Sequence, residues 1–330
     1  MLTLGIETSC DETGVGLIEG EQILANIVSS QLDHTKFGGV VPELAARNHI
    51  RTIMPVLKNA FEVAHRRLDE VDLIAVTRGP GLMGALLVGL SIAKSLAIAL
   101  RKPVIGVNHL EGHVYALSFA AQKPRYPYLI LLVSGGHTEL VLVKEEFHYQ
   151  TLGRTLDDAC GEAFDKVAKL LGLPYPGGPY IERHAHRGNV RNVRLPVPQP
   201  GAFNFSYAGL KTAVLYYVKD HPDHDASDVA ASFQESAVEH LIQVTDRALE
   251  HTGVEHLGVV GGVSVNSRLR ERFRELAQTR NLRLYLPDML HCTDNGVMIA
   301  RAGCQRFQRY GPSTLAIDAV ARESLDALTS

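Results

Sequence analysis

The chain has no tryptophan and only four cysteines among its 330 residues. No two cysteines form a C-x-x-C pair, and four are too few for a disulfide framework, so we expect a reducing compartment. The first residues lack the positive charge and apolar run of a secretory signal, and an acidic residue follows at Glu7. These features predict a cytoplasmic protein.

An excess of charge of one sign is also missing. Lys and Arg number 33 and Asp and Glu number 36, so the net charge of −3 supplies no general attraction to nucleic acid, and any such site must be local. The longest apolar stretch, residues 79–100, contains Pro80 and Lys94. We expect a buried helix there, and no membrane span. The length predicts about two lobes.

Two strand-turn-strand segments lie far apart in the chain. Residues 2–18 contain two apolar strands around a turn that is rich in carboxylates and hydroxyls. Residues 128–143 repeat this arrangement around the turn Ser134-Gly135-Gly136. Glycines in such a turn let backbone N–H groups surround an anion, and a plain tight hairpin is the alternative interpretation.

A third glycine turn follows the apolar strand at residues 257–260. Gly261 and Gly262 lead into an amphipathic helix, an arrangement that suits a phosphate or a nucleoside. Earlier, Ser232-x-x-Glu235 has the pattern of a capping box and predicts the start of another helix. Together the repeated segments predict a duplicated α/β unit that closes on a nucleotide.

Two histidines have the spacing of metal ligands. His109 and His113 are four residues apart, which places both imidazoles on one face of a helix. With Asp294 as a third ligand they would form a 2-His-1-carboxylate site with open positions, although histidine pairs at this spacing also occur as capping or surface residues. A zinc-protease motif would need Glu at position 110, where Leu110 stands, and Glu111 would point off the shared face.

The segment near residues 183–206 changes to Arg, Asn and Pro and predicts a surface excursion. It contains four arginines and no acidic residue from Arg183 through Arg194. A solvated surface is the ordinary interpretation of such a run. In a chain of net charge −3 it is also a candidate site for RNA phosphates, together with the arginines between Arg268 and Arg283.

Several of these segments resemble the tRNA adenosine threonylcarbamoyltransferase family, which comprises bacterial TsaD and its archaeal and eukaryotic relatives. The matching segments run in order from residue 5 to about residue 302. They are GIETSCDET from Gly5, HLEGH from His109, VSGGHT from Val133, FDKVA from Phe164, PGGP from Pro176, NFS from Asn204, GGV from Gly261 and CTDNG from Cys292.

The resemblance implies an α/β protein of the actin and sugar-kinase (ASKHA) type, with two ribonuclease-H-like lobes around a nucleotide cleft. The lobes would comprise residues 1–126 plus 297–330 and residues 127–296. It implies transfer of the threonylcarbamoyl group from threonylcarbamoyl-adenylate to the exocyclic amine of the adenosine 3′ of the anticodon, in tRNAs reading A-starting codons, with release of AMP. In bacteria, a non-catalytic paralogue subunit and a small ATPase would assist.

The resemblance also assigns roles to residues. His109, His113 and Asp294 would hold one divalent metal ion, iron or zinc. The residues matching the phosphate-side turn are Leu132, Val133, Ser134, Gly135 and Gly136. Those matching the adenosine side are Asp165, Gly178, Glu182 and Asn266. The family usually has Asp where this chain has Glu182, whose side chain is one methylene longer.

The reaction needs a group that removes a proton from the attacking amine. Asp11 and Glu12, at the tip of the first hairpin, are the carboxylates best placed for this role. Three alternative functions stay open: an actin-fold phosphotransferase or ATPase, whose Mg²⁺ would prefer oxygen ligands; a metalloprotease; and a non-catalytic subunit that only binds nucleotide.

Overall fold

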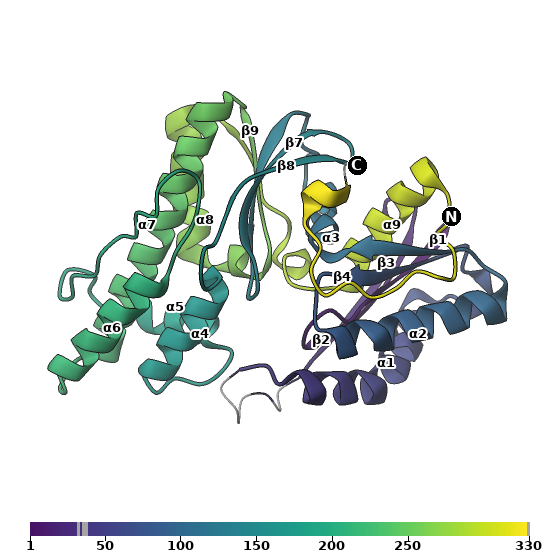
Figure 1. Cartoon of the computed structure of the whole chain (residues 1–330), viewed down its shortest axis with the longest axis horizontal. Coiled ribbons are helices and arrows are strands. Elements are labelled where there is room, and N and C mark those ends of the chain that lie inside the picture. The colour runs from purple at the N-terminus through teal and green to yellow at the C-terminus, as the bar shows by residue number, and fades with distance from the viewer. Residues whose placement is uncertain (32–33, 35–38, 329–330) are drawn as a thin grey trace. The chain divides into compact units, whose positions relative to one another are not determined.

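The computed structural model describes residues 1–31, 34 and 39–328 and divides the chain into two compact units (Figure 1). The first unit comprises Met1–Phe119 and Asp294–Ala327, and Ala120–Thr293 forms the second. The lobe boundaries expected from the sequence, 126/127 and 296/297, lie a few residues downstream of these. Residues 329 and 330, which were assigned to the first lobe, lie outside the described residues.

A five-stranded mixed sheet lies at the centre of the first unit. Its spatial order is β3-β2-β1-β4-β5, in which β1, β2 and β3 are antiparallel neighbours and β4 and β5 continue parallel to β1. The predicted pair of strands around the acidic turn is confirmed, since Ile6 of β1 lies opposite Val15 of β2. The strands are β1 (Leu2–Glu7), β2 (Glu12–Glu19), β3 (Gln22–Ser30), β4 (Leu73–Gly79) and β5 (Val104–Asn108).

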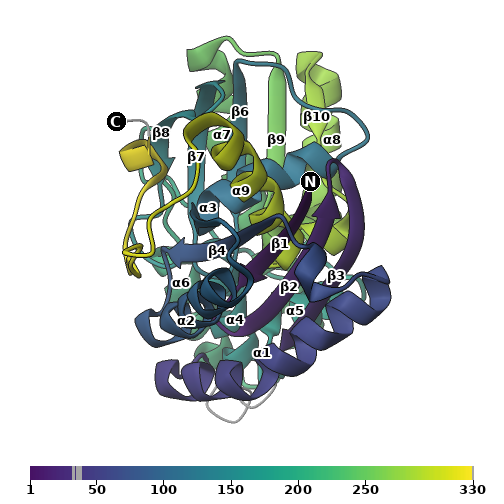
Figure 2. The same ribbon diagram turned by 90° about the vertical axis from the view of Figure 1, so that its right-hand side faces the viewer.

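Helices cover both faces of this sheet (Figure 2). α1 (Pro42–Ala64) and α2 (Met83–Leu100) pack on the face that carries Leu4 and Ile6, whereas α3 (His109–Ala116) and α9 (Gly296–Tyr310) pack on the face that carries Leu73 and Ala75. Glycine allows the close approach of α9, because a Cβ on Gly5 would lie 2.0 Å from the carbonyl oxygen of Gly296. Short 3-10 helices occur at Leu68–Glu70, Leu117–Phe119 and Leu325–Leu328.

Within the described residues, α2 is the one helix that is long and apolar enough to cross a membrane, by length and composition alone. Leu90, Ala93 and Ala97 on α2 belong to the core of the first unit. Other apolar side chains of the same helix, including Leu87 and Ile98, are exposed, so the helix predicted to be buried is packed on one side only.

The second unit repeats the topology of the first. Its sheet has the order β10-β9-β6-β7-β8, with an antiparallel run from β6 to β8 and with β9 and β10 parallel to β6. The two sheets therefore match strand for strand, which confirms the predicted duplication of an α/β unit. The strands are β6 (Tyr128–Val133), β7 (Thr138–Glu145), β8 (His148–Arg154), β9 (His256–Val260) and β10 (Arg283–Tyr285).

One core fills the second unit and includes Phe164, Phe205, Phe233 and Phe273. Its helices are α4 (Cys160–Leu170), α5 (Gly177–Ala185), α6 (Ala208–Asp220), α7 (Ala226–Thr252) and α8 (Ser267–Arg280), with 3-10 helices at Gly262–Val265 and Met289–His291. The residues between α5 and α6 form a loop, as expected for the predicted surface excursion.

The helix start predicted at Ser232 is wrong. α7 begins at Ala226, and its cap is Asp225, whose side chain accepts a hydrogen bond from the N–H of Ser227 at 2.7 Å. Ser232 is therefore inside the helix and is buried. Glu235 does not fold back on the backbone of Ser232, because it forms ion pairs with Arg268 and Arg272 on α8. The S-x-x-E pattern is satisfied by a tertiary contact and does not mark a helix end.

Candidate metal centre and ligand-binding turns

The two histidines of the HLEGH segment lie in the first turns of α3. Asn108, at the end of β5, caps this helix through its side-chain oxygen, which accepts hydrogen bonds from the N–H groups of Leu110 at 2.9 Å and Glu111 at 3.2 Å. The cap fixes where the helix begins and so which way its first turn faces. The rings of His109 and His113 lie 4.8 Å apart at 84°.

Asp294 completes a cluster with the two imidazoles. Its Oδ1 lies 3.1 Å from Nε2 of His113 and 3.6 Å from Nε2 of His109, and the three candidate ligand atoms all lie within 4.8 Å of one another. Asp294 immediately precedes Asn295, the cap of α9, so the starts of two helices bring the cluster together. All three residues belong to the first unit.

A second carboxylate orients His109. Glu7 accepts at Oε2 from Nδ1 of His109 at 3.0 Å and from the hydroxyl of Thr77 at 2.6 Å. Burial opposes a proton on His109, but the charges of Asp294 and Glu7 outweigh it and raise the pKa of the imidazole to about 9. With Nδ1 held by Glu7, Nε2 faces the cluster, which is the arrangement that metal-binding histidines adopt.

The surroundings of the His113 side chain indicate whether the cluster could hold a metal ion. The residue is fully buried, and neither ring nitrogen has a hydrogen-bond partner in the described part of the chain. Its approach to Asp294 lacks hydrogen-bond geometry. Buried polar atoms are ordinarily paired, so orphaned nitrogens beside a carboxylate fit a cation that accepts a nitrogen ligand.

Glu111 points away from this cluster, as the sequence predicted. It is fully buried and forms an ion pair with Arg306 of α9, with Oε1 3.0 Å from Nη2. A carboxylate held in this way is not positioned to activate water at the cluster, which removes the base that a zinc protease would require.

Asp11 and Glu12 lie at the tip of the first hairpin, where β2 begins, and both are half-buried. Burial and the charges of Asp11 and Asp294 raise the pKa of Glu12 well above its usual range. His49 of α1 contacts the residue on each side of this pair. Its Nδ1 lies 2.8 Å from the hydroxyl of Thr13, and its Nε2 lies 2.9 Å from the carbonyl oxygen of Cys10.

The second unit contains the predicted phosphate-side turn. Leu132 and Val133 end β6, and the turn closes when the N–H of Ser134 donates to the carbonyl of His137 at 2.8 Å. The hydroxyl of Ser134 in return accepts from the N–H of His137 at 3.1 Å. Nothing lies within 4 Å of a Cβ placed on Gly135 or Gly136, so their backbone is open to a ligand.

Three of the four residues predicted for the adenosine side form hydrogen bonds within the second unit. Asp165 accepts from the N–H of Gly177 at 2.7 Å, and Glu182 accepts from the N–H of Ser267 at 2.8 Å. Asn266 caps α8 and also donates to Gln234 at 2.8 Å. Gly178 has open space where a side chain would stand. These bonds fix the start of α5 and its contact with α8.

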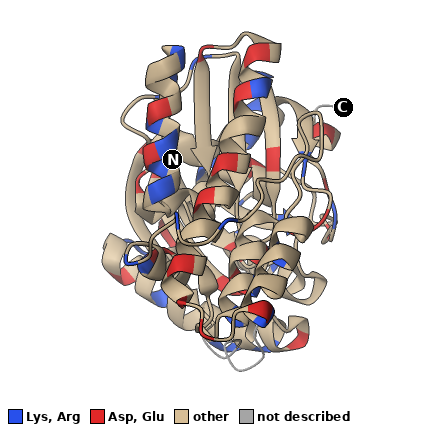
Figure 3. Cartoon of the chain, turned by 90° about the vertical axis from the view of Figure 1, so that its left-hand side faces the viewer, with Lys and Arg blue, Asp and Glu red and all other residues tan. Residues whose placement is uncertain are grey.

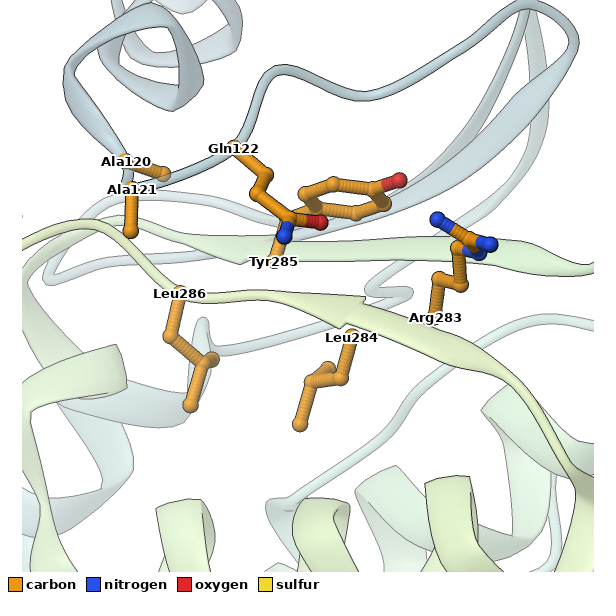
Figure 4. Close-up of a pocket in the computed structure, with 7 residues that line it drawn as sticks. All are labelled: Ala120, Ala121, Gln122, Arg283, Leu284, Tyr285 and Leu286. Atoms are coloured by element: carbon orange, nitrogen blue, oxygen red, sulfur yellow. The ribbon is translucent and has the colours of Figure 1, made fainter.

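A cavity of about 370 Å³ in the second unit was not predicted from the sequence (Figure 4). It lies along the edge strand β10 and is lined by Ala120, Ala121, Gln122, Arg283, Leu284, Tyr285 and Leu286. Arg283 and Tyr285 lie on the side of Gln122, and Leu284 and Leu286 point to the opposite side. None of the residues predicted for the metal, the donor or the base lines this cavity, although Arg283 ends the basic segment that the sequence indicated for RNA phosphates.

Solved structures identify the fold class. Component A of (R)-2-hydroxyglutaryl-CoA dehydratase from Acidaminococcus fermentans matches with a TM-score of 0.57 at 14% identity, over 93% of this chain and 98% of that chain. HypF from T. kodakarensis matches with a TM-score of 0.63 at 14% identity, over 94% of this chain and 48% of that chain. With its duplicated sheets, the chain is an α/β protein of the actin and sugar-kinase type.

Sequence relatives identify the family. The profile described as tRNA N6-adenosine threonylcarbamoyltransferase matches residues 22–301. Curated proteins of that name from Salinibacter ruber and Thermosipho africanus are 50% and 48% identical, covering 93% and 97% of this chain and 95% and 98% of their own length. The chain belongs to the tRNA N6-adenosine threonylcarbamoyltransferase family.

Proposed function

We propose that this protein transfers the threonylcarbamoyl group of threonylcarbamoyl-adenylate to the exocyclic amine of the adenosine 3′ of the anticodon, in tRNAs reading A-starting codons, and releases AMP. The observation that carries this proposal is the identity of about half over nearly the whole chain to transferases of that name. The cluster of His109, His113 and Asp294 supports it independently.

We assign these three residues as the ligands of one divalent metal ion, iron or zinc. Imidazole suits both metals, and the mixed nitrogen and oxygen donors do not select between them. When bound, the ion would supply a Lewis acid for the phosphate of the donor. Glu7 keeps His109 in the tautomer whose Nε2 is available.

The second unit provides the residues that we assign to the rest of the donor. The open backbone of Gly135 and Gly136, with Ser134 and the flanking Leu132 and Val133, suits the phosphate side, because N–H groups at a glycine turn bind anions. Asp165, Gly178, Glu182 and Asn266 are assigned to the adenosine side. The bonds that Asp165, Glu182 and Asn266 accept from neighbouring backbone N–H groups hold the backbone in place before a ligand arrives, which lowers the cost of binding.

We assign proton removal to Asp11 or Glu12. The amine nitrogen forms a bond to the carbamoyl carbon, the bond from that carbon to the phosphate oxygen breaks, and AMP leaves. The attacking nitrogen loses its proton to a carboxylate. Burial and the charges of Asp11 and Asp294 raise the pKa of Glu12, and its ionised carboxylate is therefore a stronger base than that of an ordinary exposed acid.

The finer parts of the proposal concern partners and location. A non-catalytic paralogue subunit and a small ATPase would assist the reaction in bacteria, and a tRNA substrate together with free thiols fits the cytoplasm. The alternatives are not favoured. A Mg²⁺-dependent ATPase would use oxygen ligands where this chain has imidazoles, and a zinc protease would need a free base where Glu111 is paired with Arg306.

The test is nucleoside mass spectrometry of unmodified tRNA incubated with the protein, threonylcarbamoyl-adenylate and the partner proteins. We expect threonylcarbamoyladenosine with the wild type and with His148→Ala, an exposed histidine that serves as the control, but not with His109→Ala. Product from His109→Ala would refute the metal assignment. Absence of product from the wild type with a complete partner set would refute the transferase proposal.

A further inference from the structure

Four exposed arginines follow one another on the second unit, at the end of α5 and in the loop after it. We call residues 183–194 the arginine loop; its arginines are Arg183, Arg187, Arg191 and Arg194, and it contains no acidic residue. Among the described residues, none of the four guanidinium groups has a carboxylate within 4.0 Å. Arg183 instead lies over the ring of Tyr180, 4.1 Å from its centre.

The nearby acidic side chain is already occupied. Asp228, at the start of α7, accepts from the backbone N–H of Asn189 and from the side-chain amide of Asn192, both at 2.7 Å. These two bonds lower the pKa of Asp228 and keep it ionised. Since its oxygens bind amides of the loop and no guanidinium group, its single negative charge leaves an excess of positive charge at the four arginines.

The backbone of the arginine loop is fixed on the unit. The N–H of Arg191 donates to the side-chain oxygen of Asn189 at 3.0 Å, and Val193 is buried in the core. Gly188 packs against α7 so closely that a Cβ there would lie 2.0 Å from the carbonyl oxygen of Ser227. The arginines therefore extend from an ordered base, and binding need not order the backbone first.

The other basic segment that the sequence indicated behaves differently. On α8, Arg268 pairs with Glu235 at 2.8 Å, Arg272 pairs with Glu235 at 2.6 Å and Arg280 pairs with Asp246 at 2.7 Å. Figure 3 shows basic and acidic positions interleaved along this helix. At these three arginines a phosphate would have to compete with carboxylates, whereas Arg274 on the same helix is exposed and has no carboxylate within 4.0 Å among the described residues. The contacts on α8 therefore favour an RNA site there less than those of the arginine loop.

We propose that the arginine loop is the surface on which the phosphate backbone of the tRNA docks. The inference rests on the proposed function, because that function requires an RNA substrate. Guanidinium groups bind phosphate through paired N–H donors, and such contacts place an RNA without reading its sequence. The same helix, α5, carries Gly178 and Glu182 in its first turns, so the RNA surface and the residues assigned to the donor share one rigid element.

The test compares two double variants of the full chain that lose the same charge. Arg187→Gln with Arg191→Gln removes two arginines of the loop. Arg274→Gln with Arg309→Gln removes two arginines that are also exposed but lie elsewhere. The affinity for unmodified tRNA is measured by fluorescence anisotropy between 0.05 and 0.3 M NaCl, concentrations chosen to resolve the slope of about −0.7 to −0.9 that each phosphate contact adds.

We expect the loop variant to bind tRNA about fivefold more weakly per arginine lost at 0.15 M salt, and its salt slope to fall by roughly 1.5 to 2. The KM for tRNA should rise while kcat at saturating tRNA is retained. The control variant should keep the wild-type slope. Equal losses in both variants would overturn the proposal, because they would mean long-range charge and no specific surface.

Two further outcomes separate this proposal from others. If the loop variant kept its affinity for tRNA but lost binding of a partner protein, the surface would be a protein interface, and the RNA proposal would be wrong. If the wild type bound tRNA with the expected dependence on the loop but produced no threonylcarbamoyladenosine, the transferase function would fail and the RNA surface would stand.

Discussion

At the scale of single residues, the candidate site contains one buried side chain, that of His113, whose polar atoms lack hydrogen-bond partners among the described residues. The ring nitrogens of His113 have no hydrogen-bond partner in the described part of the chain, although the residue is fully buried. Burial of an unpaired polar group costs about 1–3 kcal/mol, so a structure that retains one usually gains something from it. A metal ion bound by His113, His109 and Asp294 would offset that free-energy cost.

The metal assignment predicts loss of the ion on a single substitution. His113→Ala should reduce the bound iron or zinc from about one per chain to nearly none, since two ligands do not make a stable site. Elemental analysis of the purified protein measures this, with His148→Ala as the control that retains the metal. Undiminished metal in His113→Ala would show that the ion is held elsewhere.

The assignment of the base predicts that its loss slows the transfer step without changing the affinity for tRNA. Glu12→Gln keeps the shape of the side chain but cannot accept a proton, so single-turnover transfer should slow by roughly 10²-fold while tRNA affinity is unchanged. Asp11→Asn, made in parallel, shows which of the two carboxylates acts. If neither variant slows the single turnover, the proton leaves to water or to another group.

The lowered pKa of a buried histidine outside the candidate site leads to a prediction of how the free energy of unfolding depends on pH. His240 on α7 is buried between Phe205 and Tyr207 and accepts from the N–H of Ser206 at 3.2 Å. Burial lowers its pKa from 6.5 to about 4. Between these values the unfolded chain binds the proton and the folded chain does not, so the free energy of unfolding must decrease as the pH falls from 6.5 to 4.

The expected loss of stability between pH 7 and pH 4.5 is about 2–3 kcal/mol. Urea unfolding at the two pH values measures it. His240→Gln should be less stable at pH 7 and should lose this part of the pH dependence, whereas His221→Gln should retain it. A pH dependence that is the same in His240→Gln and in the wild type would contradict the buried neutral histidine.

At the scale of secondary-structure elements, a buried ion pair fixes α3 against α9. These helices carry the candidate ligands at their starts, and Glu111 and Arg306 join them. Arg306→Met should destabilise the protein by about 3 kcal/mol, because it removes the positive charge that pairs with the buried carboxylate of Glu111. It should also weaken metal binding by shifting the ligands relative to one another.

A double variant separates the ion pair from simple loss of packing. Glu111→Met combined with Arg306→Met removes both charges and should recover most of the stability lost in Arg306→Met, as measured by the urea midpoint. If the double variant were no more stable than the single one, the cost would come from the lost side-chain contacts of Arg306 and not from an unpaired charge.

At the scale of the whole molecule, the two units differ in how the chain builds them. Ala120–Thr293 supplies all five strands and the helices of the second unit, whereas α9 joins the first unit from the other end of the chain. In the first unit, Gly5 and Gly16 allow α9 to pack closely on the sheet. A Cβ on either would lie within 2.3 Å of backbone atoms of Gly296 or Val297. Without α9, one face of that sheet would be exposed.

This organisation predicts the behaviour of fragments. Residues 120–293 should fold alone with a cooperative urea transition, because they contain a complete core. Residues 1–119 should not, and joining residues 294–327 to them through a flexible linker should restore cooperative folding. Circular dichroism and urea titration test this, and a cooperative transition of residues 1–119 alone would contradict the role given to α9.

Local patterns in the sequence were sufficient for the repeated hairpins, for the helix that carries His109 and His113, and for the duplication of the two units. These features depend on residues that lie close together in the chain, whose periodicity reports directly which face is buried. The start of α7 was mistaken because Glu235 of the Ser232 motif pairs with arginines on α8, a contact that no local pattern can reveal.

The sequence by itself determined the strands, the amphipathic helices and the residue types available for chemistry. The tertiary structure decided which of them meet. It brings Asp294 to His113, as the sequence had indicated, and it alone shows that Glu111 pairs with Arg306. Among the described residues, it also pairs carboxylates with three arginines of α8 but with none of the arginine loop. The physical reason is that charges and ligands act over a few ångströms in space. Only folding brings side chains remote in sequence within that distance.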